Sequence, residues 1–395
     1  AFPLKVTQRH DGTPPRAARL CREVAMAQGA GKGTAVEEAQ QSGWVARGNG
    51  NGAASEHDLV YVNDGAPGIT RRRRGKGFSY YDPDGNLIQD PDVRKRLDSL
   101  AIPPAYRDVW ICPRPDGHLQ ATGRDERGRK QYIYHPRWME LRERDKFEHL
   151  LEFAESLPGI RRRVGRDLGL EGLPREKVLA AVVRLLETTL ARVGNSSYAK
   201  ENNSYGLTTI RKKHVEIEDD TVQFEFAGKG GQEWHVETDD PRVMEVVRTC
   251  VEIPGYELFK YLGEDGNRYD VHSGHVNSYL KEITGRDVTA KDFRTWAATV
   301  LCAQELEGAQ FEKPTQAKRN IVTAVKEVAQ VLGNTPAVCR KSYVHPAVFD
   351  AYLDGSLAAR LEEWRGRREE TPAGLRNDER AVWGLLTERT AAPSR

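Results

Sequence analysis

The sequence predicts an α+β protein in which a small, mostly antiparallel β-rich domain precedes a mostly α-helical domain with a small three-stranded sheet. Short runs of β-branched and aromatic residues, separated by turn residues, predict the β-rich domain over residues 58–137. From residue 138 onward, apolar residues recur with the period of a helix, which predicts the second domain over 138–395. The length of 395 residues suits two or three domains with buried cores.

Residues 1–57 are expected to form a flexible N-terminal extension. The stretch 28–34 and the Gly-Asn repeat at 48–52 are small and polar, so they offer little apolar surface to bury. Gly31-Lys32 resembles part of a phosphate-binding loop. However, Met26 and Gly33 stand where that motif needs glycine and Ser or Thr, so no nucleotide site is predicted there.

The β-rich domain is expected to consist of short strands joined by tight turns and one short helix. Asp82-Pro83-Asp84-Gly85 and Pro115-Asp116-Gly117 are typical turn sequences. The predicted strands are 59–62, 78–81, 109–112, 119–122 and 131–134, and the helix is 93–100.

The second domain is expected to be helical with three strands in its middle. A long amphipathic helix begins after Pro174, and Gly194 is its predicted C-terminal cap. Gly228-Lys229-Gly230-Gly231 predicts a hairpin turn with one lysine at its tip. The strands are expected at 214–218, 222–226 and 233–237, helices at 290–305 (capped by Thr289) and 316–332 (ending at Gly333), and a solvated helical tail with a frayed end thereafter.

Composition limits the possible classes of protein. Charged residues make up 30% and the mean hydropathy is −0.66, and no run reaches the roughly 18 apolar residues of a membrane helix. The first residues lack the apolar region of a secretory signal. Five cysteines without a CxxC pair favour a reduced, cytoplasmic location over a disulfide framework or zinc site.

The charge distribution indicates nucleic acid more clearly than the net charge does. The whole chain has 60 Lys and Arg against 58 Asp and Glu, a net charge of +2. Residues 71–147 hold 18 Lys and Arg against 12 Asp and Glu, so this segment carries +6 and the remainder −4. Basic side chains neutralise phosphates and release counterions, which produces sequence-independent DNA affinity. The predicted phosphate contacts come from two basic runs that precede aromatic strands: Arg71, Arg72, Arg73, Arg74, Lys76, Arg124, Arg127, Arg129 and Lys130.

Other familiar catalytic signatures are absent from the sequence. His272 and His275 could form a metal-binding pair, but no further ligand has a recognisable spacing and no HExxH occurs. No Gly-x-Ser-x-Gly motif supports a serine nucleophile. We therefore predict neither a metal site nor a cofactor.

Five residues in separate contexts form the pattern on which the functional prediction depends. Taken singly, four of them have a structural explanation: a charge at a helix end, a solvated turn lysine, an arginine near Trp296 that stacks on an aromatic neighbour, or a core aromatic. Those explanations do not account for their joint order. The five are Arg192 in Ala-Arg-Val-Gly-Asn, Lys229 in Phe-Ala-Gly-Lys-Gly, Arg294 in Lys-Asp-Phe-Arg-Thr-Trp, and Asn334 and Tyr343 in Leu-Gly-Asn-Thr-Pro-Ala-Val-Cys-Arg-Lys-Ser-Tyr.

This order resembles the type IB DNA topoisomerases, especially the poxvirus-like group found in viruses and many bacteria. The resemblance spans roughly residues 58–360 and is closest between Arg192 and His214, while the basic β-domain text looks like the bacterial members. It implies the catalytic fold shared by tyrosine recombinases and these topoisomerases, within a C-shaped clamp around duplex DNA. It also implies relaxation of positive and negative supercoils without ATP or metal.

The resemblance implies a role for each of the five residues. Tyr343 would attack a phosphate and hold the DNA 3′ end, exchanging one phosphodiester for another. Arg192 and Arg294 would stabilise the charge on the nonbridging oxygens, and Lys229 would protonate the leaving 5′ oxygen. Asn334 would donate a further hydrogen bond, although many relatives carry histidine there. Further DNA contacts are implied for Tyr132 and Tyr134, which as strand residues could equally be core, and for Tyr198 and Lys291.

A second departure from the poxvirus pattern concerns target choice. Those enzymes place lysines at the positions of Asn195 and Ser197, where they help to read a preferred pentamer. Without those donors we expect no strict target preference of that kind.

Two alternative functions remain: a tyrosine recombinase or integrase, and a noncatalytic DNA-binding clamp. Recombinases typically carry His-x-x-Arg at the second arginine, whereas this chain has Lys291-x-x-Arg294. The complete set of five residues disfavours a noncatalytic clamp. We expect a monomer that acts on duplex DNA in the cytoplasm, at the nucleoid, with no membrane association and no obligatory protein partner.

Overall fold

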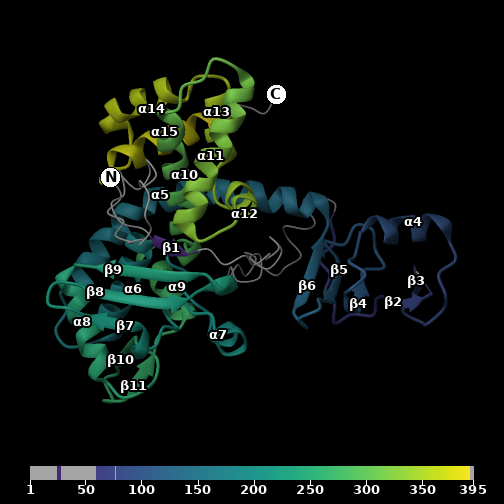
Figure 1. Cartoon of the computed structure of the whole chain (residues 1–395), viewed down its shortest axis with the longest axis horizontal. Helices are drawn as coiled ribbons and strands as arrows, with labels where there is room; N and C mark the ends of the chain where they lie inside the picture. The colour runs from purple at the N-terminus through teal and green to yellow at the C-terminus, as the bar shows by residue number, and fades with distance from the viewer. Residues whose placement is uncertain (1–24, 28–58, 76, 392–395) are drawn as a thin grey trace. The chain divides into compact units, whose positions relative to one another are not determined.

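The computed structural model describes residues 25–27, 59–75 and 77–391. The chain divides into two compact units, Thr34–Lys146 and Phe147–Arg395 with Ala1–Gly33. The division falls inside helix α5 (Pro136–Asp167), and the boundary predicted at residue 137 lies in the first turn of the same helix (Figure 1). Among the described residues, no helix combines the length and apolar composition needed to cross a membrane.

The first unit, here called the β unit, contains a five-stranded antiparallel sheet, as the sequence predicts. Its strand order is β3-β2-β4-β5-β6. The buried side chains of Ile69, Val109, Ile111 and Ala121 form its core together with Leu97 from the helix. The elements are β2 (Ile69–Arg74), β3 (Gly77–Tyr81), α4 (Pro91–Ser99), β4 (Arg107–Ile111), β5 (Leu119–Arg124) and β6 (Lys130–Tyr134).

Residues 59–62 do not form the predicted strand. They make a single isolated bridge, between Val60 and Gly117. The N–H of Val60 donates to Asp116 O, and the N–H of His118 donates to Val60 O. The N–H of Val62, however, donates to the side-chain Nδ1 of His118 at 3.0 Å. Because a side chain replaces the next backbone partner, the ladder does not continue.

The basic run of residues 71–74 is itself part of a strand, which was not predicted. It forms most of β2 and pairs with β3, with Arg71 opposite Tyr80 and Arg73 opposite Phe78. The guanidinium of Arg71 lies 4.1 Å from the Phe78 ring centroid. Cations and aromatics that are neighbours in sequence are therefore also neighbours across two strands, within cation–π distance.

The second unit, here called the helical unit, contains the predicted three-stranded sheet. The strands are β7 (Val215–Ile217), β8 (Val222–Ala227) and β9 (Glu233–Thr238). A short strand that was not predicted, β1 (Ala25–Ala27), pairs antiparallel with β9 and gives the order β1-β9-β8-β7. The remainder of the 1–57 segment, predicted to be flexible, lies outside the described residues.

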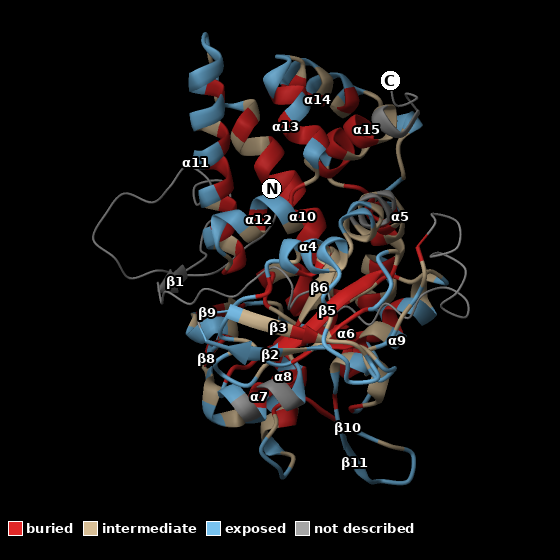
Figure 2. Cartoon of the chain, turned by 90° about the vertical axis from the view of Figure 1, so that its right-hand side faces the viewer, coloured by how far each residue is buried: buried red, intermediate tan, exposed pale blue. Residues whose placement is uncertain are grey.

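The sheet packs through one face, since alternate residues of β8 and β9 are buried. Helices α6 and α10 are buried on nearly all sides (Figure 2). The predicted helix starting after Thr289 is confirmed, and Gly333 ends the next one in the left-handed region with φ 63°. The helices are α6 (Arg175–Thr189), α7 (Ser196–Asn202), α8 (Pro241–Glu252), α9 (Ser273–Thr284), α10 (Ala290–Glu307), α11 (Pro314–Leu332), α12 (Pro336–Ser342), α13 (Pro346–Leu353), α14 (Leu357–Gly366) and α15 (Asn377–Ala391); β10 (Lys260–Leu262) and β11 (Arg268–Asp270) form a separate hairpin.

Helix α6 ends four residues earlier than predicted. Leu190, rather than Gly194, is its C-terminal cap and has a left-handed φ of 56°. The following residues leave the helix because their carbonyls pair elsewhere: Leu207 N–H donates to Arg192 O, and Thr208 N–H donates to Val193 O. Arg192 therefore lies beyond the end of the helix, two residues after its C-terminal cap.

The C-terminal helices are packed into the helical unit, which corrects the prediction of a solvated tail. Helices α14 and α15 bury apolar side chains including Leu361, Leu385 and Leu386. Their many charges are accommodated in pairs. Glu379 is fully buried and receives two N–H groups from Arg161 of α5, at 2.6 and 2.8 Å. Pairing of opposite charges permits such burial, and composition alone does not reveal it.

Candidate active site

Four of the five residues predicted to act in catalysis come together in the helical unit. Nη2 of Arg192 donates a hydrogen bond to Oδ1 of Asn334. The guanidinium carbon of Arg294 lies 5.3 Å from the Tyr343 ring centroid. Arg294 also donates to the carbonyls of Leu190 and Leu332, which each lie two residues before a member of the first pair. These contacts join four separate chain segments into one cluster.

Close backbone packing fixes the segment that carries Arg192. It runs beside residues 206–208, and the hydroxyl of Thr208 also donates to Val193 O at 2.8 Å. A Cβ added to Gly206 would lie 2.5 Å from Arg192 O and 2.6 Å from the Gly194 backbone. Only glycine allows this approach, so Gly206 holds Arg192 in place. No motif in the sequence marks Gly206.

Arg294 lies on the buried helix α10 and holds two other segments of the site in place. Its side chain is 3% exposed, and its Nη2 donates to Leu332 O at 2.6 Å. Its aromatic neighbour is the Tyr343 ring. A guanidinium has five N–H donors, so these carbonyl contacts are compatible with a contribution to phosphate binding.

Asn334 presents a buried donor to the site. It directly follows the left-handed Gly333, and its N–H donates to Ala329 O at 2.9 Å. Its Oδ1 accepts from Arg192, while its Nδ2 is buried and has no hydrogen-bond partner within the described part of the chain. An unsatisfied buried donor costs stability. The arrangement therefore suits an oxygen acceptor supplied by a ligand, such as a nonbridging phosphate oxygen.

Tyr343 follows α12 and is 3% exposed, so its hydroxyl must become accessible before it can reach a phosphate. Its backbone is held on both sides. Its N–H donates to Cys339 O at 3.0 Å, and the hydroxyl of Thr299 donates to its carbonyl at 3.2 Å. The same hydroxyl accepts the N–H of His345 at 3.2 Å. Thr299 thus positions the tyrosine segment, and nothing in the sequence marks this buried threonine.

Lys229 lies at the tip of the β8–β9 hairpin, as predicted. The turn closes through a bond from Gly228 N–H to Gln232 O at 2.6 Å, and Gly230 and Gly231 have positive φ of 79° and 78°. The half-buried lysine therefore projects from a tight turn. The hairpin base joins the Arg192 region through a bond from Tyr205 N–H to Ala227 O at 2.7 Å. The general-acid role of Lys229 stays a prediction.

The predicted DNA-contacting cations of the β unit differ in their contacts within the protein. Arg71 donates to the carbonyls of Ile102, Pro103 and Tyr106 at 2.8 to 3.2 Å, so its guanidinium joins parts of the unit to each other. Burial lowers the pKa of Arg71. Three other side chains also contact their own unit: Arg124 donates to Gly128 O, Arg129 pairs with Asp125, and Lys130 pairs with Asp64.

The remaining predicted contacts stay predictions. Arg72, Arg73, Arg74 and Arg127 are exposed, and Lys291 is half-buried at the start of α10. Tyr132 and Tyr134 are half-buried, with ring centroids 6.2 Å apart. Lys76 and the side chain of Tyr198 lie outside the described residues.

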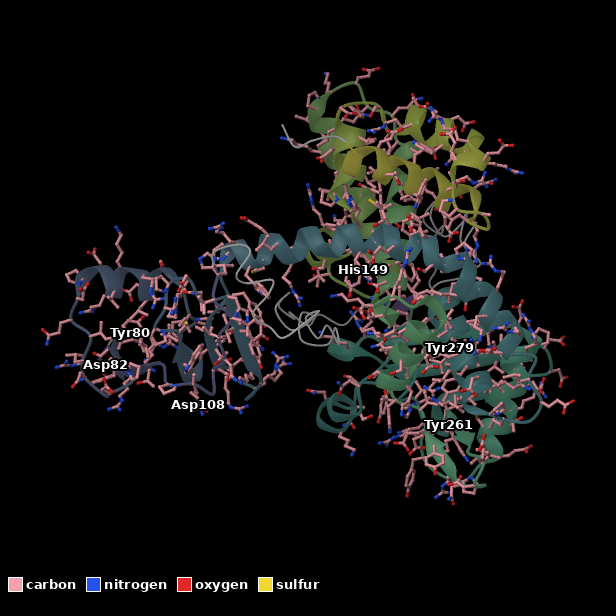
Figure 3. All side chains as sticks on the ribbon, turned by 180° about the vertical axis from the view of Figure 1, so that it is seen from behind. Tyr80, Asp82, Asp108, His149, Tyr261 and Tyr279 are labelled. Atoms are coloured by element: carbon pink, nitrogen blue, oxygen red, sulfur yellow. The ribbon has the colours of Figure 1, made fainter. Side chains whose placement is uncertain are left out.

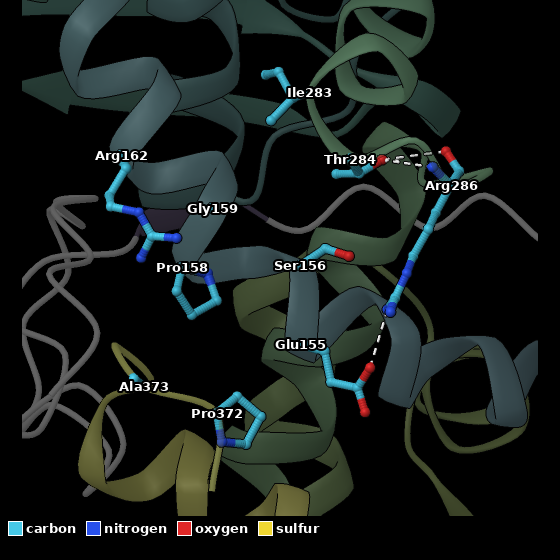
Figure 4. A pocket seen from close by; sticks show the side chains of 10 residues that line it. All are labelled: Glu155, Ser156, Pro158, Gly159, Arg162, Ile283, Thr284, Arg286, Pro372 and Ala373. Carbon is cyan, nitrogen blue, oxygen red and sulfur yellow. Dashed lines mark hydrogen bonds and ion pairs between the residues drawn. The ribbon is translucent and has the colours of Figure 1, made fainter.

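A shallow cavity in the helical unit lies away from the candidate active site. It has a volume of about 320 Å³ and lies between α5, the end of α9 and the segment before α15 (Figure 4). It is lined by residues including Glu155, Arg162 and Arg286, and none of the five predicted catalytic residues lines it. Within the described ranges, no three His, Cys, Asp or Glu side chains gather closely enough to hold a metal ion. His272 and His275 have ring centroids 5.4 Å apart at the start of α9.

Comparison with known proteins gives two family matches. Residues 135–369, which include all five predicted catalytic residues, match the catalytic core of eukaryotic DNA topoisomerase I. Residues 77–125 match the N-terminal domain of bacterial DNA topoisomerase IB.

Individual relatives cover most of the chain. DNA topoisomerase 1B of Acanthamoeba polyphaga mimivirus is 32% identical over 293 residues, which cover 72% of this chain and 87% of the relative. DNA topoisomerase 1B of vaccinia virus (strain Copenhagen) is 24% identical over 278 residues, covering 69% and 83%. DNA topoisomerase 1 of Mycosarcoma maydis is 24% identical over 200 residues, covering 45% of this chain and 19% of the relative.

Proposed function

The chain belongs to the type IB DNA topoisomerases, and on this premise we propose that it relaxes positive and negative supercoils through a transient 3′-phosphotyrosyl break in one strand. Family membership makes it a DNA-binding isomerase. The cluster of Arg192, Arg294, Asn334 and Tyr343, brought together from four chain segments, carries the finer proposal.

The proposed chemistry is a reversible transesterification. The phenolic hydroxyl of Tyr343 loses its proton to solvent as its oxygen attacks the phosphorus, a tyrosyl–phosphate bond forms, and the bond from phosphorus to the 5′ oxygen breaks. Lys229 gives a proton to that 5′ oxygen, and the free 5′ hydroxyl later reverses the reaction. One phosphodiester replaces another, so the reaction needs no ATP.

The charge that develops on the nonbridging oxygens determines what the site must supply. Arg192 and Arg294 are permanently charged and can donate hydrogen bonds, so they provide the positive charge without a metal ion. The buried Nδ2 of Asn334 adds a donor beside Arg192. Preorganised donors of this kind are typically worth about 10²–10³-fold in rate each.

We further propose that the protein works as a monomer whose β unit and helical unit close around duplex DNA. The exposed cations of β2 would contact backbone phosphates, which position the duplex without reading its sequence. Action on chromosomal DNA would place the protein in the cytoplasm, at the nucleoid.

A relaxation assay tests the proposal. Negatively and positively supercoiled plasmids are incubated in EDTA without nucleotide, with the wild type and with Tyr343→Phe. We expect the wild type to relax both and the variant to relax neither. In a parallel reaction stopped with detergent, a nicked strand labelled at its 5′ end should stay attached to the wild-type protein. Attachment of a 3′-labelled fragment instead, or an active variant, contradicts the proposed linkage or nucleophile.

The recombinase alternative has a distinct signature. A recombinase yields joined products between two specific sites. The match of residues 135–369 to a topoisomerase core favours supercoil relaxation at many sites.

A further inference from the structure

Helix α5 runs from the β unit into the helical unit, and its side chains contact segments of the candidate active site where it enters the helical unit. The helix is continuous from Pro136 to Asp167, and the division between the units falls directly before Phe147. The side chains of Phe147 and His149 reach two different elements of the candidate active site. His149 is labelled on this helix in Figure 3.

His149 contacts the start of the helix that carries Arg294. Its side chain is 7% exposed, with Nδ1 3.2 Å from Oε2 of Glu152 and Nε2 3.5 Å from Oδ2 of Asp292. Burial alone would lower the pKa of His149, but Asp292 and Glu152 raise it overall above its ordinary value. The geometry thus places a cationic or hydrogen-bonding imidazole between the acid on its own helix and the acid on α10.

Asp292 is the third residue of α10 and forms a capping box with Thr289, the N-cap residue. The same oxygen, Oδ2, accepts the N–H of Thr289 at 2.8 Å and the hydroxyl of Thr289 at 2.9 Å. Such a reciprocal cap fixes the direction in which a helix begins. Arg294 follows two residues later, so a shift of Asp292 is passed to Arg294 within one helical turn.

Phe147 contacts the segment that follows the predicted nucleophile. Its ring centroid lies 4.5 Å from that of His345. The N–H of His345 donates to the hydroxyl of Thr299, which donates to Tyr343 O, and Nδ1 of His345 accepts the N–H of Ala347 at the start of α13. His345 is therefore tied into the same backbone network that holds Tyr343.

We propose that Phe147 and His149 are positioning residues through which helix α5 sets the placement of Arg294 and Tyr343. Residues two apart on a helix point about 200° from each other, so α5 lies between its two contacts rather than touching both with one face. A rotation or translation of α5 must then disturb both contacts, the one with Asp292 and the one with His345. Because α5 also leads into the β unit, DNA binding by that unit can displace α5 and thereby change the placement of Arg294 and Tyr343.

This inference rests on the proposed function, since it assumes that Arg294 and Tyr343 act on the scissile phosphate. The test uses the full chain with His149→Ala, His149→Gln and Phe147→Ala. Glu155→Gln is the matched control, because Glu155 lies on the same helix and its ion pair with Arg286 (3.0 Å) has both side chains about 40% exposed. Three quantities are measured: single-turnover cleavage of a 5′-labelled duplex with the enzyme in excess, equilibrium DNA affinity, and the thermal unfolding midpoint.

We expect His149→Ala and Phe147→Ala to cleave roughly 10- to 100-fold more slowly, the range expected from misplacement of reacting groups, with DNA affinity within about twofold of the wild type. The amide N–H of His149→Gln can still donate to Asp292, so this variant should regain most of the rate. Glu155→Gln should match the wild type throughout. Because Phe147 is only half-buried, its variant keeps the test valid if His149→Ala does not fold.

The outcomes separate the two proposals. A wild type that forms no covalent adduct overturns the proposed function and this inference with it. A wild type that forms the adduct, with unchanged cleavage by folded His149→Ala or Phe147→Ala, overturns the inference alone. Equal losses in His149→Ala and His149→Gln also overturn it, because the polar contact with Asp292 would then be irrelevant.

Discussion

Arg192 donates a hydrogen bond from Nη2 to the side-chain oxygen of Asn334, which lies 142 positions later in the chain. This contact fixes the orientation of the amide, because a guanidinium can only donate and must face the oxygen. The Nδ2 of Asn334 therefore points away from Arg192, where a second acceptor can use it. One hydrogen bond thus determines which group Asn334 offers to the DNA.

Substitutions of Asn334 should reveal this donor. We expect Asn334→Ala to slow single-turnover cleavage by about 10- to 100-fold, because one donor to the transition state is lost. Asn334→Asp keeps the acceptor for Arg192 but replaces the donor with a negative charge beside the phosphate. It should therefore be slower than Asn334→Ala. An alanine variant with wild-type cleavage would remove Asn334 from the mechanism.

Gly206→Ala should disturb Arg192 without touching its side chain. The new Cβ would meet the Arg192 carbonyl at 2.5 Å, and all its nearest contacts are backbone. We expect a loss of roughly 1–3 kcal/mol in the free energy of unfolding together with slower cleavage. The control is Gly165→Ala inside α5, where a Cβ meets nothing within 4 Å. It should stabilise by about 0.5–1 kcal/mol, as measured by urea unfolding.

Two arginines of strand β2 should behave differently when replaced. Arg74→Ala should lower DNA affinity and reduce the slope of log affinity against log salt by about one, provided the exposed Arg74 contacts a phosphate. Arg71→Ala should instead cost roughly 1–3 kcal/mol of unfolding free energy, because three carbonyls lose their donor. Binding titrations over a salt series and urea unfolding separate the effects. A reversal of the two phenotypes would show that the assignment is wrong.

Glu379→Gln should destabilise the helical unit by about 3–5 kcal/mol near neutral pH, because it breaks a buried ion pair with Arg161. Burial alone would raise the pKa of Glu379, but Arg161 lowers it overall below its ordinary 4.5. A carboxyl with a lowered pKa stabilises the fold above its unfolded pKa, and this stabilisation is lost as pH falls. The difference between wild type and variant should therefore shrink below about pH 4.5. Urea unfolding across pH checks this, and a constant difference would contradict it.

Local chemistry made the elements predictable, and tertiary pairing decided where they end. Thr289 and Gly333 bound their helices as expected because a cap and a left-handed glycine act within one turn. Helix α6 instead stops at Leu190, because residues 206–208 compete for the carbonyls that follow. That competition comes from a distant segment, so periodicity within the helix cannot show it.

Motif order selects a candidate set of residues, but it does not give their geometry. Motif order identified the residues of the Arg192–Tyr343 cluster, yet their contacts run through backbone carbonyls and through Thr299, which carry no sequence signal. For the charged C-terminal helices, the sequence predicted the wrong exposure to solvent. Composition suggested solvation, whereas Arg161 from a remote helix neutralises Glu379 and allows its burial.

Arg294 donates hydrogen bonds to the carbonyls of Leu190 and Leu332, so it holds in place the two segments that carry Arg192 and Asn334. Lysine has a single ammonium and cannot span both carbonyls in the same fork. An Arg294→Lys variant thus loosens its neighbours as well as weakening its own attraction for phosphate. A slower cleavage rate in this variant therefore has two causes. The part that comes from displaced neighbours can be measured by also replacing Arg192 or Asn334 in this variant and comparing the remaining cleavage rates.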